Sequence, residues 1–67
     1  MKIRFDNKIY SLKAIKLAIK DYQGLADFNL DQKKEYTQVE LTKINKEFKK
    51  IIKEEFCNYV LFLMKTD

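Results

Sequence analysis

The sequence predicts a small α+β domain with the element order β-α-β-β-α. Two short segments of alternating apolar and polar residues lie close together in the middle of the chain, and a third lies at its start. Such alternation is typical of half-buried strands, while two longer segments carry apolar stripes at helical spacing. The 67 residues are expected to form one domain, residues 1–67, with a three-stranded antiparallel sheet and both helices on one face.

The first strand is expected at residues 2–5, where Ile3 and Phe5 point to one face and basic residues point to the other. A turn is expected at residues 6–8, because Asp and Asn side chains readily bond their own backbone. Residues 9–10 are then expected to resume a short extended pairing.

The first helix is expected at residues 12–23. Ser11 is suited to cap it, and Tyr10 and Ile15 have the spacing of a hydrophobic staple. Gly24 follows at the C′ position, where a positive φ is expected. The apolar stripe of this helix consists of Leu12, Ile15, Ala18, Ile19 and Tyr22.

A hairpin is expected next, because alternating segments at residues 26–31 and 36–41 are separated by a short polar turn. If the first and third strands pair, the strand order is 1-3-2. The outer face of this hairpin carries Asp27, Asp31 and Glu40, which are expected to form a solvated acidic surface rather than a metal site.

The last helix is expected to start near Thr42 or Asn45, either of which can cap it, and to run for about 20 residues or 30 Å. Its lysines are expected to form the solvated side. Its apolar stripe consists of Ile44, Phe48, Ile51, Ile52, Phe56, Tyr59 and Val60.

The composition argues against an enzyme and favours a binding module. The chain has no His, one Gly and one Cys, so it lacks the usual general base, a glycine-rich phosphate loop and a Cys-rich zinc site. No cofactor or metal is expected, and Cys57 is expected to be a small core residue. No apolar run approaches the roughly 18 residues that span a membrane, and a cytoplasmic location is expected.

A chain of this size is marginally stable alone, so a partner or a homodimer is expected. Residues 59–64 are six consecutive apolar residues, and one helix stripe needs only about half of them. Some of these side chains should therefore face outward and form a partner surface. The candidate interface residues are Tyr59, Leu61, Phe62 and Met64.

Two segments of the chain resemble a known family. Residues 5–18 have the pattern F-D-x-x-I-Y-S-L-x-A-I-x-x-A, and residues 55–61 read EFCNYVL. Together they resemble the HxsD-like family, small proteins of the His-Xaa-Ser peptide-maturation system. The resemblance implies a non-catalytic accessory that holds a precursor peptide or docks on a radical SAM maturase.

The alternative function is nucleic-acid binding. The net charge is +4, and two lysine-rich helix faces could contact phosphates. The acidic middle of the chain argues against this alternative, and so does the position of Tyr36, the one aromatic residue expected on the outer face of the sheet, which acidic residues surround. The candidate phosphate-binding residues are Lys13, Lys16, Lys20, Lys46, Lys49, Lys50 and Lys53. A third possibility is an extended peptide added to an open sheet edge, although the sequence does not indicate which edge is free.

Overall fold

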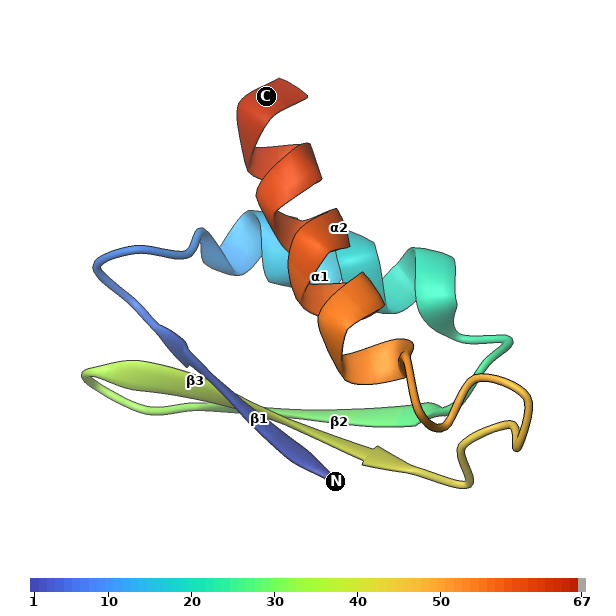
Figure 1. Ribbon diagram of the computed structural model, residues 1–67. Coiled ribbons are helices and arrows are strands. Elements are labelled where there is room, and N and C mark those ends of the chain that lie inside the picture. The colour runs from blue at the N-terminus through green and yellow to red at the C-terminus, as the bar shows by residue number, and fades with distance from the viewer. Residues whose placement is uncertain (67) are drawn as a thin grey trace.

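The computed structural model describes the main chain of residues 1–66 and the side chains of residues 1–65. It confirms the α+β class and the order β-α-β-β-α (Figure 1). The elements are β1 (Lys2–Asp6), α1 (Leu12–Tyr22), β2 (Asp27–Gln32), β3 (Tyr36–Thr42) and α2 (Ile52–Thr66).

The strand order is β1-β3-β2, and both pairings are antiparallel, as predicted. Ile3 lies opposite Val39 on one side of β3, and Leu30 lies opposite the same residue on the other side. Because side chains alternate along a strand, these three point to one face. Figure 1 shows both helices covering a single face of the sheet, so the layer arrangement is also as expected.

Phe56 of α2 lies at the centre of the core and is fully buried. Its ring lies 5.2 Å from that of Phe28, 5.5 Å from that of Tyr22 and 6.0 Å from that of Phe5. One side chain therefore joins both edge strands and α1 to α2. The buried apolar residues are Ile3, Phe5, Ala14, Ile15, Ala18, Ala26, Val39, Leu41, Ile52, Phe56 and Val60.

The N-cap of α1 agrees with the sequence prediction, but the structure of the segment before it does not. Ser11 Oγ accepts from the amide of Ala14 at 3.3 Å, which confirms the predicted N-cap. The extended pairing expected at residues 9–10 is wrong. The amides of Ile9 and Tyr10 both donate to the carbonyl of Asp6, so this segment is a turn.

Two details of α1 also differ from the prediction. Leu12 lies outside the core and is partly exposed, although it was expected to belong to the buried stripe. Gly24 does follow the C-cap residue Gln23, but its φ is not positive. The chain instead leaves the helix through a turn in which the amide of Leu25 donates to the carbonyl of Tyr22 at 2.9 Å.

The start of α2 is the point at which the structure differs most from the prediction. The helix begins at Ile52, not near Thr42 or Asn45. β3 continues to Thr42, and Lys43 then adopts a φ of 51°, which breaks any continuous helix. Asn45 Oδ1 accepts from the amide of Glu47, so it caps a turn rather than a helix. α2 has 15 residues and is therefore about 22 Å long.

Candidate functional site

The C-terminal half of α2 carries exposed apolar side chains, as the run of six apolar residues predicts. Phe62 is 57% exposed and Leu61 is 37% exposed. Figure 1 shows this end of α2 rising past α1, away from the sheet, which explains why they are not buried. Tyr59 and Met64 are only partly exposed and pack against the core. Of the four candidate interface residues, the structure thus exposes Leu61 and Phe62 most and leaves Tyr59 and Met64 only partly exposed.

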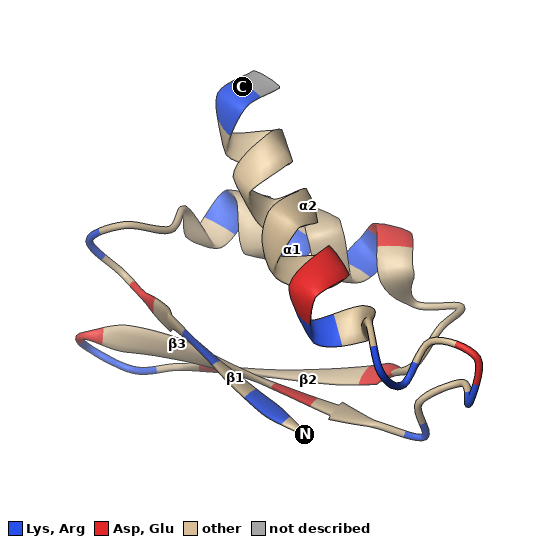
Figure 2. Cartoon of the chain, in the orientation of Figure 1, with Lys and Arg blue, Asp and Glu red and all other residues tan. Residues whose placement is uncertain are grey.

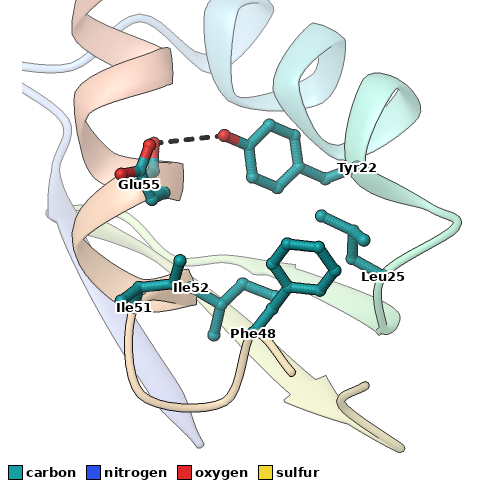
Figure 3. Close-up of a pocket in the computed structure, with 6 residues that line it drawn as sticks. All are labelled: Tyr22, Leu25, Phe48, Ile51, Ile52 and Glu55. Carbon is teal, nitrogen blue, oxygen red and sulfur yellow. Dashed lines mark hydrogen bonds between the residues drawn. The ribbon is translucent and has the colours of Figure 1, made fainter. Parts of the chain in front are cut away.

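An apolar hollow of about 290 Å³ lies between the end of α1, the segment before α2 and the first turn of α2. Figure 3 shows its lining side chains, with the rings of Tyr22 and Phe48 facing the two isoleucines. The Tyr22 hydroxyl donates to the main-chain oxygen of Glu55 at 3.4 Å, which links the two helices at the rim. The lining residues are Tyr22, Leu25, Phe48, Ile51, Ile52 and Glu55.

The sequence did not predict this hollow. Ile51 was expected in the buried stripe of the last helix, but it is 48% exposed. The hollow exists because residues 46–51 form turns instead of helix, which carries Phe48 to one wall and leaves Ile51 at the rim. Its apolar lining could accept an apolar side chain.

The hollow is connected to Phe62 along one side of α2. Ile51 and Phe62 are 11 residues apart, which is close to three helical turns, and the amide of Glu55 already bonds to the carbonyl of Ile51 at 3.0 Å. Aromatic rings lie between them: Tyr22 is 5.3 Å from Tyr59, and Tyr59 stacks on Phe62 at 6.1 Å. We call Ile51, Tyr22, Tyr59 and Phe62, together with the hollow beside Ile51 and Tyr22, the seam surface.

The Tyr59 hydroxyl fixes the position of the seam surface, because it donates to Asp21 Oδ2 of α1 at 2.5 Å. This hydrogen bond, followed by burial and by the charges of Asp21 and Tyr22, raises the pKa of Tyr59 above its usual 10.0. Burial and then the charge of Glu55 raise the pKa of Tyr22 as well. Both phenols therefore stay neutral, and the surface keeps its apolar character at physiological pH.

Stability is expected to fall as the pH rises above about 10, in part because of Tyr59. A folded-state pKa above the unfolded value favours the folded state below the unfolded pKa, and this contribution is lost as the pH passes the folded value. Tyr59→Phe should therefore flatten the dependence of the melting temperature on pH between about 9 and 11. Tyr36→Phe, on the opposite face of the sheet, is the control. Identical pH profiles for Tyr59→Phe and wild type would contradict this assignment.

The lysines that could contact phosphates fall into two separate groups. Lys13, Lys16 and Lys20 are exposed along α1 and line a shallow hollow there with Leu12 and Leu17. The second predicted face is wrong, because Lys46, Lys49 and Lys50 precede α2 and only Lys53 lies on the helix. Figure 2 shows basic residues along α1 and again in the segment before α2.

The aromatic ring on the open face of the sheet, that of Tyr36, is not part of either lysine group. Tyr36 lies on that face with the guanidinium of Arg4 at 4.4 Å from its ring centre. This cation–π contact occupies one side of the ring. Tyr36 therefore does not supply either lysine group with the aromatic platform that is typical of single-strand binding.

The acidic residues and the cysteine are weak candidates for metal binding and for thiol chemistry. Asp27 and Asp31 form exposed ion pairs with lysines at 3.9 and 3.1 Å. Among the residues that the structure describes, no group of three or more His, Cys, Asp or Glu is placed to hold a metal ion. Burial raises the pKa of the half-buried Cys57 thiol, and Lys53 only partly offsets this. The thiol is therefore the unreactive form at neutral pH.

No helix in the described part of the chain is long and apolar enough to cross a membrane. Comparison with protein-family models, with curated proteins and with solved structures finds no match for this chain. The resemblance to the HxsD-like family therefore stays a prediction, and the function must be argued from the surfaces described above.

Proposed function

We propose that this chain is a non-catalytic binding module that docks on a protein or peptide partner through the seam surface. The observation that carries the proposal is the exposure of Ile51 (48%) and Phe62 (57%) on the same side of α2, beside an apolar hollow. Exposed apolar residues that are contiguous, rather than scattered, mark interaction sites.

The shape of the seam surface favours a side chain of a partner over a small-molecule cofactor. At about 290 Å³ the hollow is at the lower end of the range for ligand pockets, which is about 300–1,000 Å³. Pockets that receive one apolar anchor are common at the centre of protein interfaces. Tyr22 and Phe48, which line the hollow, would flank such an anchor with aromatic surface, which interfaces favour.

The HxsD-like resemblance supports the same class of function. It suggests a cytoplasmic accessory protein whose partner is a radical SAM maturase or its precursor peptide. We also propose that the chain forms a homodimer, because a domain of this size gains stability from covering exposed apolar surface. The seam surface is the natural contact for a symmetric dimer, since the same patch would be used by both copies.

Phe62→Asp is expected to leave the protein folded and to weaken self-association and partner binding at least about tenfold, because it places a charge in the apolar contact. Sedimentation velocity would measure the self-association, and mass spectrometry would identify proteins that co-purify from the native host. Thr42→Asp makes the same charge change at an exposed polar position of β3, on the open face of the sheet and away from α2, and is the matched control.

Unchanged assembly and unchanged co-purification in Phe62→Asp would overturn the proposal, provided circular dichroism shows that the variant is folded. An equal loss in Thr42→Asp would also count against the seam surface, because the added charge alone would then account for the loss of assembly. The HxsD-like assignment in particular requires that an iron–sulfur enzyme or a short precursor peptide is recovered with the wild type.

Nucleic-acid binding is the second candidate, and the exposure of three lysines along one side of α1 favours it. Phosphate contacts release counterions, so such binding must weaken steeply with salt. Apolar docking on the seam surface depends far less on salt. Binding of single-stranded RNA that vanishes in Lys16→Glu and at raised salt would support this second function.

A further inference from the structure

The strand order leaves the outer edge of β2 unpaired within the described chain. The amide of Lys33 donates to the carbonyl of Tyr36 at 2.8 Å, which makes these two residues a hydrogen-bonded pair of the hairpin. Hydrogen-bonded and non-hydrogen-bonded pairs alternate in an antiparallel ladder. By the observed register, the main-chain groups of Phe28, Leu30 and Gln32 therefore point away from β3, toward the open edge.

The helices cover the two edges of the sheet unequally. On β1, Ile3 and Phe5 are 3% and 1% exposed. On β2, the inward-facing Phe28 and Leu30 are both only partly buried, although they contact the same core. An additional strand beside β2 would bring new apolar side chains next to these two, under the helix layer. A strand added beside β1 would find no such uncovered apolar surface.

The opposite face of β2 is acidic. Asp27 and Asp31 alternate with the two apolar residues and point to the open face of the sheet. Each forms an ion pair with an exposed lysine, at 3.9 and 3.1 Å. Exposed pairs of this kind contribute little to stability, so a partner's cations can replace these lysines at small cost.

We propose that the edge of β2 accepts an extended peptide strand in which apolar residues alternate with Lys or Arg. Its main chain would bond to the free groups of Phe28, Leu30 and Gln32, as in other cases of strand addition. Its apolar side chains would pack beside Phe28 and Leu30, and its cations would lie beside Asp27 and Asp31. This inference rests on the proposed function, for which it names the class of peptide.

A second copy of β2 does not fit this edge. Two antiparallel β2 strands would bring the acids of one copy beside those of the other, and like charges on neighbouring strands are destabilising. β1 has a suitable pattern, with Lys2 and Arg4 alternating with apolar residues, but repeated β1-to-β2 contacts between copies would form an open-ended array. The charges and the open edge therefore favour a separate basic peptide.

The test uses a fluorescent peptide of about eight residues that alternates valine and lysine, with both ends blocked. Anisotropy at physiological salt should detect binding, and a valine–glutamate peptide should not bind. Asp31→Lys should weaken the binding about tenfold, because it replaces attraction with repulsion. Glu54→Lys makes the same charge change on α2 and should have little effect.

Amide exchange measured by NMR gives an independent readout. Bound peptide should protect the amides of Phe28, Leu30 and Gln32, while Lys2 and Arg4 at the other open edge remain unprotected. Protection at β1 in place of β2, or bound peptide without protection at either edge, would overturn the proposal, and so would equal weakening by Asp31→Lys and Glu54→Lys. Polymers of the chain that dissociate in Asp31→Lys would also overturn it, in favour of a second copy.

The two surfaces can be tested separately, because Phe62 and β2 belong to different parts of the fold. Phe62→Asp should retain the basic peptide at β2 even when partner docking is lost. If the seam surface fails its own test but the peptide still protects β2, only the proposed docking function is lost. If docking survives and the peptide does not bind, only the inference about β2 is lost.

Discussion

Replacing Phe56 with alanine is expected to destabilise the protein by about 3–5 kcal/mol, because large-to-small changes at buried phenylalanine lose transfer energy and leave a cavity. Phe56 is fully buried and contacts the rings of Phe5, Tyr22 and Phe28. A chain of this length has a total stability of about 3–10 kcal/mol. The variant is therefore expected to lose about a third or more of the total stability and to unfold at a much lower urea concentration than the wild type.

Urea unfolding followed by circular dichroism measures this loss. Phe62→Ala removes the same side chain from an exposed position of the same helix and is the matched control, expected to change stability by less than about 1 kcal/mol. A Phe56→Ala variant that unfolds at the same urea concentration as Phe62→Ala would contradict the central position of this ring in the core.

The sheet could be predicted because its signals are local. Ile3 and Phe5 in β1, and the two alternating segments of the hairpin, each have a period of two. The hairpin fixes β2 beside β3, and pairing of β1 with β3 was the preferred way to bring the inward apolar residues under the helices. The N-cap of α1 was also visible, because Ser11 precedes an apolar stripe.

The start of α2 could not be predicted from periodicity. Ile44, Phe48, Ile51 and Ile52 keep a helical spacing, and three of them do contact or enter the core. Ile44 and Phe48 reach it from the segment before α2 instead of from a helix. Tertiary contacts hold this segment, since the amide of Asn45 donates to the carbonyl of Leu25 at 2.9 Å. Apolar spacing alone does not distinguish these two routes to burial.

The candidate site also has a part that could be predicted from the sequence and parts that could not. The exposure of Phe62 follows from counting apolar residues against the width of one helix stripe. The hollow beside Ile51 depends on the turn before α2, so no local pattern indicated it. The open edge of β2 needed the register of the hairpin, which depends on the bond between Lys33 and Tyr36.

Asn7→Ala is expected to destabilise the protein by about 2 kcal/mol, because it leaves a buried hydroxyl without a partner. Thr37 is fully buried, and its hydroxyl donates to Asn7 Oδ1 at 2.7 Å. Asn7 Nδ2 also donates to the carbonyls of Lys33 and Lys34 at 3.0 and 3.3 Å. One side chain thus joins the turn after β1 to the turn of the hairpin, 26–30 residues away.

A double-mutant cycle in urea separates the buried hydroxyl from the other two bonds. Thr37→Val in the Asn7→Ala background should recover about 1 kcal/mol, because it removes the unpaired hydroxyl and keeps the shape of the side chain. The same substitution in the wild type should destabilise, because it leaves Asn7 Oδ1 without its donor. Additive effects would mean that the bond between Thr37 and Asn7 contributes nothing. The loss of stability in Asn7→Ala would then come from the two hydrogen bonds to the carbonyls of the hairpin turn.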